Sequence, residues 1–330
     1  MTGSVTIYDV AARAGVSIST VSQVINRPGR VNPQTRDRVL KAVEDLAYVP
    51  KAAAVSHARQ GVGRIGVLAP FTSYDSYRRR LMGVLAESDG TSRDVVVYDH
   101  ESAAASAAPM LRILPATGRL DGLLIMGLPL DDALAENLLS RRLPTVLVDS
   151  SRPEFHTVNV DDEEGGAIAA RHLLDRGHRT FAFVQEPQES FEFLSQGQRR
   201  NRGFLRAAGL SEDAVPVVLT RNDVAGSRKA LHDVLAHTPR PTAVFAHHDV
   251  LAAGLLLEAR RLGVRVPEEL AVVGFDDGSI AEATGLTTVR QPFEESGRLG
   301  ARLLGDLLGG TSESRQHIVL GLELVVREST

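Results

Sequence analysis

Several carboxylates and imidazoles directly follow short apolar runs that are typical of buried strands. They are Asp149 after TVLV, His247, His248 and Asp249 after VFA, and Asp276 and Asp277 after VVGF. A carboxylate at a strand end can accept hydrogen bonds from ligand hydroxyl or amino groups, and it can equally serve as a helix cap or a loop residue. These positions are therefore candidates for ligand contacts.

Motifs for catalysis and nucleotide binding do not support an enzyme. GVGRIG at 61–66 matches G-x-G-x-x-G, but it precedes a predicted strand, whereas the dinucleotide fingerprint follows a strand and opens a helix. The sequence contains no G-x-x-x-x-G-K-[ST], H-E-x-x-H or G-x-S-x-G. Adjacent histidines on one strand end rarely converge on one ion, so we expect no metal and no cofactor.

A second group of polar side chains lies on two short helical patterns near the N-terminus. Apolar residues of the first pattern recur at helical spacing, at Ile7, Val10, Ala11 and Ala14. Gly15 is suited to end this helix, and Ser17 to cap the next one. The second pattern has the apolar stripe Val21, Val24 and Ile25, and its other face carries Ile18, Ser19, Ser22, Gln23 and Asn26.

A third helical pattern follows, with Asn32 as its cap, Pro33 in its first turn and the stripe Val39, Val43 and Leu46. Two helices joined by a tight glycine turn are the sequence form of a helix-turn-helix. From the pattern alone, this unit either binds DNA or is an ordinary helical subdomain without a ligand.

Length, composition and charge narrow the class of protein. The 330 residues are 43% apolar and include no cysteine, which predicts two or three domains without disulfides. No signal peptide or membrane-length apolar run is visible, so we expect a cytoplasmic protein. Residues 1–60 carry eight basic and four acidic residues, whereas 61–330 carry 29 and 37. A basic head on an acidic body favours nucleic-acid binding, although so modest a bias can arise by chance.

From residue 64 onward, short apolar runs alternate with helical patterns such as 164–176 and 249–262. The runs are 64–69, 94–99, 121–126, 145–149, 180–184, 215–219, 242–246 and 270–276. Continuous apolar runs indicate strands buried on both faces of a parallel sheet. Two series of such repeats favour two doubly wound lobes over a (β/α)₈ barrel, and ligands then bind at the strand carboxyl ends, in a cleft between the lobes.

Residues 6–50 closely resemble the DNA-binding head of the LacI/GalR family of transcriptional regulators. The remainder resembles that family's periplasmic-binding-protein-like core, through GGAIAARHLLDRGHR (165–179), RNRGF (200–204), LAVVGFDD (270–277) and LTTVRQP (286–292). The resemblance implies a head over 1–50, a hinge helix and linker over 51–61, and a core over 62–330. It divides the core into an N-lobe (about 62–159 and 290–316) and a C-lobe (about 160–289 and 317–330).

The resemblance implies that the second helix lies in the major groove. Ile18, Ser19, Ser22 and Gln23 would then approach base edges, while Ser17 and Asn26 cap the helix or touch phosphate. The family usually carries Arg at the position of Gln23, which implies a different preferred base pair. The further expected DNA contacts are Thr6, Tyr8, Thr20, Arg30, Ala54 and His57.

The hinge implied by the resemblance is KAAAVSHAR at 51–59. Nine residues are too few for a stable isolated helix, so we expect it to fold on DNA. Family members insert a leucine from each hinge helix into the minor groove and open a base step. This sequence has His57 at that position, and an imidazole is a less apolar wedge than leucine.

Effector contacts carried over from the family are Asp149, Arg200 and Asp276, and we add Phe71. This sequence departs from the family at two positions. His248 stands where the family usually has Asn, and Val224 lies where an aromatic ring of family members often stacks on the ligand. An arginine and a carboxylate suit a polyol, so we expect a sugar or sugar derivative, with a sugar phosphate, a nucleobase-like molecule or no effector as alternatives.

The function implied is that of a homodimeric repressor of a carbohydrate-metabolism operon, which binds a pseudo-palindromic operator and responds to a small molecule. No apolar heptad tail follows LELVVREST, so we expect a dimer and not a tetramer. Three alternatives are a solute-binding protein, a cytoplasmic enzyme, and a regulator whose effector is a partner protein.

Overall fold

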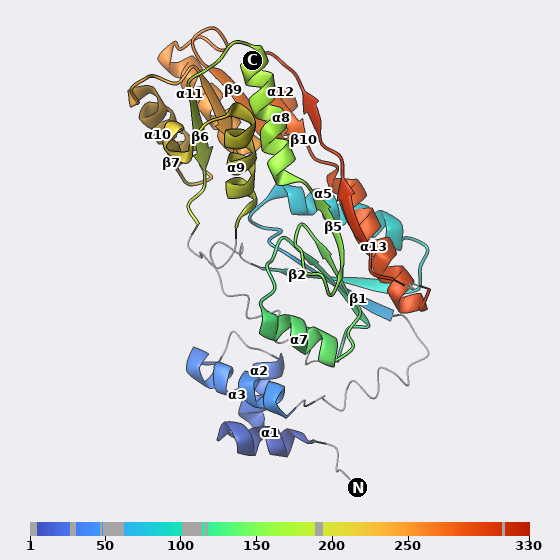
Figure 1. The fold of residues 1–330 in the computed structure, drawn as a ribbon. Helices are drawn as coiled ribbons and strands as arrows, with labels where there is room; N and C mark the ends of the chain where they lie inside the picture. Colours follow the sequence, from blue (N-terminus) through green and yellow to red (C-terminus); the bar gives the residue numbers. More distant parts are fainter. Residues whose placement is uncertain are drawn as a thin grey trace. The chain divides into compact units, whose positions relative to one another are not determined.

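The structure is a computed structural model that describes residues 5–26, 31–46, 48, 63–100, 114–115, 118–188, 194–311 and 314–330. Its contacts divide the chain into two compact units (Figure 1). The first unit is Met1–Val158 with Glu294–His317, and the second is Asn159–Phe293 with Ile318–Thr330. Each unit is therefore completed by a segment that is distant in the sequence.

The N-terminal head consists of helices α1 (Ile7–Ala14), α2 (Ile18–Asn26) and α3 (Pro33–Asp45). Their apolar faces share one small core, which buries Val10, Val21, Val24, Val39 and Val43. Helices this short are marginal in isolation, so the common core is what holds them together. The three helices confirm the prediction from apolar spacing.

The connections in the head also follow the sequence prediction. Gly15 ends α1 in the left-handed conformation, with φ of 62°. The Oγ of Ser17 accepts a hydrogen bond from the Thr20 N–H at 3.1 Å at the start of α2. The Asn32 side chain caps α3 by accepting from the Gln34 N–H at 2.9 Å. These caps satisfy N–H groups that a helix start leaves unpaired.

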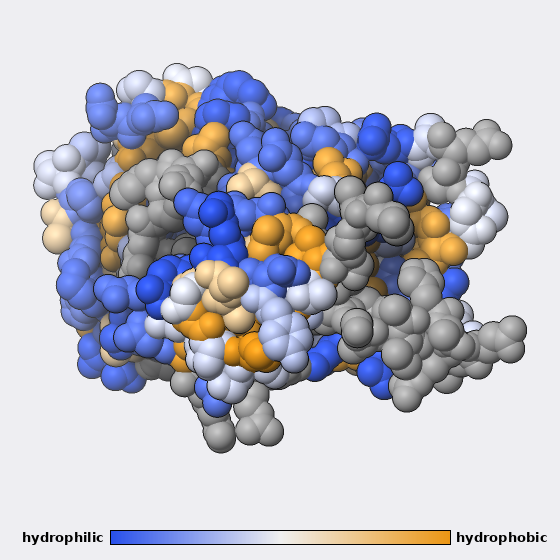
Figure 2. All heavy atoms as spheres, turned by 90° about the horizontal axis from the view of Figure 1, so that it is seen from below, coloured by the Kyte–Doolittle hydropathy of each residue, from blue (hydrophilic) through white to orange (hydrophobic). Residues whose placement is uncertain are grey.

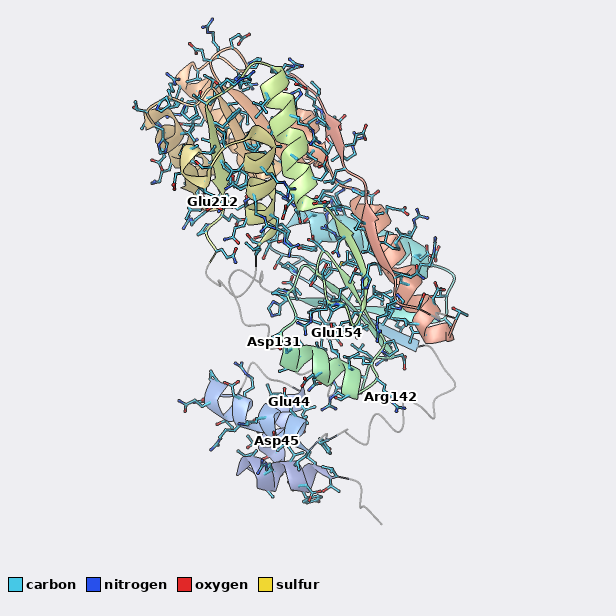
Figure 3. The ribbon with its side chains drawn as sticks, in the orientation of Figure 1. Glu44, Asp45, Asp131, Arg142, Glu154 and Glu212 are labelled. Carbon is cyan, nitrogen blue, oxygen red and sulfur yellow. The ribbon has the colours of Figure 1, made fainter. Side chains whose placement is uncertain are left out.

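The first core sheet has six strands in the order β11-β5-β4-β3-β1-β2. Their bounds are β1 (Gly63–Ala69), β2 (Arg93–Asp99), β3 (Gly122–Met126), β4 (Thr145–Val148), β5 (His156–Val160) and β11 (His317–Leu320). Strands β1 to β5 pair in parallel. Helix α7 (Asp132–Ser140), capped by Asp131 (Figure 3), packs on one face, where Leu134 and Leu138 meet Leu123 and Ile125.

The opposite face of this sheet is covered by α13 (Phe293–Gly309), which packs on α5 (Asp75–Ser88). A Cβ on Gly83 of α5 would lie 1.9 Å from the backbone oxygen of Glu294, so the helices approach through glycine. A Cβ on Gly300 of α13 would lie 2.8 Å from Val148 of β4. Both faces of the sheet are thus covered, as the continuous apolar runs predicted. The edge strand β2 is the exception, because none of its residues is fully buried.

The second core sheet has the order β12-β10-β9-β8-β6-β7. Its strands are β6 (Phe181–Gln185), β7 (Val217–Leu219), β8 (Ala243–Ala246), β9 (Ala271–Asp276), β10 (Thr287–Arg290) and β12 (Glu323–Val325). All neighbours pair in parallel except β12, which runs antiparallel to β10. Two separate open sheets confirm the doubly wound architecture and exclude a (β/α)₈ barrel.

Helices cover both faces of the second sheet. Along β6, Phe183 packs toward α8 (Asp162–Asp175) and α9 (Gln196–Ala208). The next residue, Val184, packs toward the helices of the other face, which are α10 (Val224–Ala236), α11 (Asp249–Leu262) and α12 (Ser279–Thr284). A short 3₁₀ helix, η2 (Glu212–Ala214), precedes β7. The carboxyl ends of these strands carry most of the polar residues singled out from the sequence.

No helix within the described ranges combines the length and apolar character that crossing a membrane requires. The face of the molecule drawn in Figure 2 is mostly hydrophilic, with apolar side chains gathered in small patches.

Candidate DNA-binding and effector sites

Helix α2 turns an apolar side to the core of the head and leaves a polar side exposed. Val21 and Val24 have no exposed surface, whereas Ile18 is 39% exposed and Gln23 is exposed. The Ser17 hydroxyl lies 2.7 Å from that of Ser19 and 2.8 Å from that of Thr20. The exposed side therefore offers short hydroxyls, one amide and one apolar group, the kinds of side chain that can read base edges.

Of the other expected DNA contacts, the structure describes the side chains of Thr6, Tyr8 and Ser22. Tyr8 is 67% exposed, and Ser22 is half-buried. The Thr6 hydroxyl donates to Asp9 at 2.7 Å, and this hydrogen bond lowers the pKa of Asp9. The side chain of Asn26 and all of Arg30, Ala54 and His57 lie outside the described residues.

In the first unit, the carboxylate of Asp149 is held by two neighbours at the end of β4. The Tyr77 hydroxyl donates to it at 3.0 Å, and the Arg80 guanidinium lies 3.5 Å away. Burial and the adjacent Asp149 charge raise the pKa of Tyr77 well above its usual value. Asp149 has φ of 56°, a conformation that L-residues rarely adopt and that is concentrated at functional sites.

In the second unit, three contacts hold the side chain of Arg200, which lies on α9. Its Nε donates to Asp162 at 2.9 Å, its Nη1 donates to the backbone oxygen of His247, and its guanidinium carbon lies 3.7 Å from the centre of the Phe275 ring. The side chain is almost completely buried. These contacts fix the guanidinium plane, as a residue that orients a ligand requires.

Three carboxylates gather where β8 and β9 end. Asp276 accepts a hydrogen bond from the Gln291 amide at 2.7 Å, and Asp277 accepts from Arg290 and Arg327. Asp249 is buried and accepts from the Thr288 hydroxyl and the Gly278 N–H. Burial and the nearby Asp276 raise the pKa of Asp249 to about 8.

Asp276 and Asp277 also have positive φ, at 119° and 53°. Together with Asp149, they place three strained backbone positions at strand ends. Strain of this kind persists only where the surrounding structure enforces it, so it marks these strand ends as candidate binding edges.

Two imidazoles lie at the end of β8 beside the carboxylate of Glu186, which directly follows β6. The Oε2 atom of Glu186 is 3.5 Å from Nε2 of His247 and 3.4 Å from Nε2 of His248. Burial, followed by the adjacent His248, lowers the pKa of His247 to about 3. The two imidazoles lower the pKa of Glu186 far below its usual value, against the opposing effect of burial.

The two remaining effector candidates are less informative. Phe71 is half-buried in the turn after β1, where its N–H donates to the backbone oxygen of Ala69. Val224 is the first residue of α10, and its side chain lies outside the described part of the structure.

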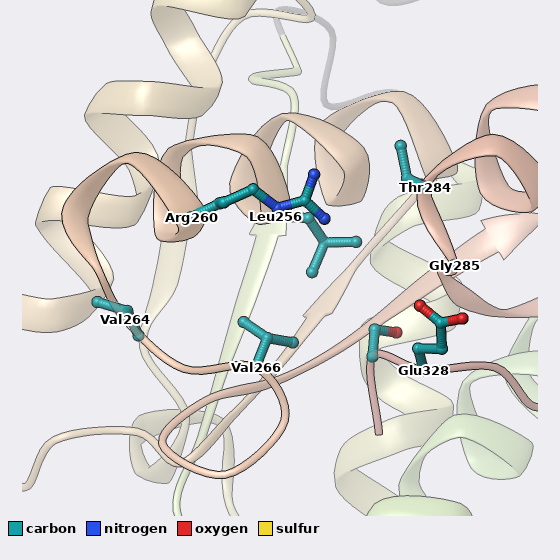
Figure 4. A pocket seen from close by; sticks show the side chains of 8 residues that line it. Leu256, Arg260, Val264, Val266, Thr284, Gly285 and Glu328 are labelled. Carbon is teal, nitrogen blue, oxygen red and sulfur yellow. The ribbon is translucent and has the colours of Figure 1, made fainter.

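A cavity of about 220 Å³ in the second unit lies apart from these residues (Figure 4). Leu256, Arg260, Val266 and Glu328 are among the residues that line it. They come from the second half of α11, the loop after it and the C-terminal segment, and no effector candidate named above lines this cavity.

Comparison with known proteins identifies the family. Residues 6–51 match bacterial regulatory proteins of the lacI family, and residues 170–330 match a periplasmic binding protein-like domain. The HTH-type transcriptional regulator DegA of Bacillus subtilis (strain 168) is 32% identical over 335 residues, which cover 98% of both proteins. The chain belongs to the LacI family.

Solved structures of LacI-family proteins superpose on nearly the whole chain. The complex of the transcriptional regulator CelR with cellobiose is 30% identical, with a TM-score of 0.71 and coverage of 99% of this chain and 100% of that one. The lac repressor dimer bound to operator and the anti-inducer ONPF is 26% identical, with a TM-score of 0.70 and coverage of 99% of both chains.

Membership of the LacI family makes this protein a DNA-binding transcriptional regulator and not an enzyme. It also accounts for the helix-turn-helix head and the bilobal, periplasmic-binding-protein-like core in one chain.

Four residues at the strand-end sites were not identified from the sequence, namely Tyr77, Arg80, Asp162 and Glu186. The first three are recognisable only by contacts to residues that lie 38 to 72 positions away. Glu186 is different, because it directly follows β6 just as Asp149 follows β4. The rule applied to other strand ends would have found it.

Proposed function

We propose that this LacI-family regulator is a homodimeric repressor of a carbohydrate-metabolism operon, controlled by a sugar or sugar derivative. Recognition of the operator is supported above all by the exposed side of α2. This side lies opposite the buried stripe and carries Ile18 and Gln23. A dimer places one such helix on each half of a pseudo-palindromic operator. The structure of the lac repressor dimer bound to operator supports this arrangement.

The effector contacts in this proposal are Arg200 of α9, Asp276 at the end of β9 and Asp149 after β4. Arg200 and Asp276 offer a donor fork and an acceptor within one unit, which suits vicinal hydroxyl groups. The cellobiose held by CelR supports a sugar. Effector binding shifts operator affinity through a coupling free energy of about 1–3 kcal/mol.

Selection of DNA fragments from the source genome tests this proposal. We expect a few fragments with a two-fold repeat to be enriched at moderate salt, and a chain lacking residues 1–60 to enrich none while still binding the effector. Absence of any sequence preference by the full chain would overturn the proposal. The genes next to the enriched fragments would indicate the effector.

The hinge helix expected at 51–59 lies outside the described residues, and we propose that it folds only on operator DNA, with His57 in place of the leucine that family members insert at the centre. Because an imidazole is less apolar than leucine, we expect a smaller DNA bend for the wild type than for H57L. The bend angle measured by gel mobility or scattering decides this, and an equal, large bend in both would show that the substitution is harmless.

A further inference from the structure

Glu186, His247 and His248 form a cluster that the family comparison does not explain. The two rings stand at 82° with centroids 4.3 Å apart, and one ligand atom from each of the three residues lies within 4.8 Å of the others. Two imidazoles and a carboxylate are a common ligand set for zinc.

The positions of the hydrogens argue against a metal. Nδ1 of His247 accepts a hydrogen bond from the Glu186 N–H at 3.3 Å, and Nδ1 of His248 accepts from the Leu251 N–H at 3.2 Å. A neutral imidazole has one hydrogen, so both Nε2 atoms carry it. A metal at Nε2 needs a lone pair there and a hydrogen on Nδ1, which would face a backbone N–H on each ring.

The cluster therefore presents two N–H donors to one carboxylate. The imidazoles are the inner members, with side chains 13% and 8% exposed, and the Glu186 side chain is 24% exposed. Nε2 of His248 is buried and makes no well-directed hydrogen bond to a described residue; the Oε2 atom of Glu186 lies 3.4 Å from it. A buried N–H in this position is costly until an acceptor reaches it.

We propose that Glu186 is an effector-binding residue that accepts hydrogen bonds from the hydroxyl groups of a neutral sugar or polyol, with His248 as a second effector contact and His247 as a positioning residue. This inference rests on the proposed effector site in the same unit. Arg200 links the cluster to that site, because its guanidinium donates to the backbone oxygen of His247.

A hydroxyl group fits the cluster better than a charged group. It can donate to the Glu186 carboxylate and accept from an imidazole N–H, whereas an ammonium has no acceptor. A ligand carboxylate would be repelled by Glu186, and the guanidinium of Arg200, which contacts the backbone oxygen of His247, already has its counter-charge in Asp162. The cluster therefore selects the neutral form among otherwise matched sugars.

The test titrates the full chain with cellobiose, D-glucose, D-glucuronate, D-glucosamine and zinc chloride, and follows binding by calorimetry. We expect at least one neutral sugar to bind, its charged counterpart to bind at least about tenfold more weakly, and E186Q to lose about tenfold or more in affinity. E212Q, a change at an exposed residue of η2 (Figure 3), is the matched control and should bind sugar as the wild type does.

Three results would overturn the inference: preferential binding of glucuronate or glucosamine, zinc binding that E186Q abolishes, or no binding of any neutral sugar. The nitrogen NMR shifts of the two imidazole rings are a second measurement, which needs no sugar. Shifts that place the hydrogens on Nδ1 would contradict the proposed Nε2–H donors. Operator binding is measured on the same wild-type sample. A sample that binds operator but gives one of these three results contradicts the role of Glu186 and leaves the proposed regulatory function standing.

Discussion

The guanidinium of Arg200 stacks on the ring of Phe275 at 3.7 Å, which joins α9 to the end of β9, one residue before Asp276. The same guanidinium pairs with Asp162 at the start of α8, where both side chains are 7% exposed. One buried cation thus links two helices and a strand of the second unit. Its counter-charge and its packing are accordingly the first features to test.

Replacing Asp162 by asparagine should destabilise the protein. The buried guanidinium of Arg200 would lose its counter-charge, and breaking such a pair costs about 3–5 kcal/mol in the free energy of unfolding. Urea unfolding followed by fluorescence or circular dichroism measures this loss. E164Q, which breaks an exposed pair with Arg171 on the same helix, should cost about 1 kcal/mol or less. Equal losses in the two variants would contradict the buried role of Asp162.

Replacing Gly166 by alanine should also destabilise the second unit, although alanine favours helix over glycine by about 1 kcal/mol. A Cβ at this position would lie 1.8 Å from the backbone oxygen of Arg200, so α8 and α9 must separate. We expect a net loss of about 1–3 kcal/mol, seen as a lower melting temperature.

The matched control for this change is G321A, because a Cβ on Gly321 would meet no atom within 4 Å. G166A should in addition weaken the response to effector, since α9 carries Arg200. A melting temperature equal to that of G321A would show that the helices accommodate the methyl group.

Replacing Gln23 by arginine should change the preferred operator at one base pair in each half-site. Glutamine pairs best with adenine and arginine with guanine, and a good bidentate contact is worth about 1–3 kcal/mol of discrimination. Binding-site selection with the wild type and Q23R compares the two preferences directly. Identical preferred sites would mean that Gln23 does not read a base edge.

Stability should fall in mild acid because of His247. An unfolded histidine titrates near 6.5, whereas His247 in the folded protein has a pKa of about 3, so between these values the unfolded state binds a proton that the folded state does not. The contribution of His247 to the free energy of unfolding is thus fully present above about pH 6.5 and is lost as the pH falls toward 3. The loss is about 1.4 kcal/mol per pH unit, or about 2 kcal/mol at pH 5.

Urea unfolding at pH 7 and pH 5 tests this effect. H247Q should lose less stability between the two pH values than the wild type does, because glutamine does not titrate. H237Q, a change at an exposed histidine of the same unit, is the control. If H247Q loses as much stability between pH 7 and pH 5 as the wild type does, the group that titrates is not His247.

The helices of the head and the type of core sheet could be predicted from the sequence, because they depend on interactions between residues that are close along the chain. The spacing of Val10, Val21 and Val24, the turn at Gly15 and the caps at Ser17 and Asn32 act between near neighbours, and the structure confirms them. Continuous apolar runs likewise predicted strands buried on both faces, because two-sided burial leaves no polar alternation.

Tertiary structure alone decided which groups meet at the strand ends. Glu186 and His248 are 62 positions apart, and Arg200 and Asp162 are 38 apart, yet each pair is within 3.4 Å. Parallel strands bring residues of different repeats to one edge, and their register sets which side chains face each other. The hydrogen-bond state of an imidazole depends on such neighbours, so the sequence could name His248 as a candidate but could not show that its Nδ1 caps α11 and its Nε2 faces Glu186.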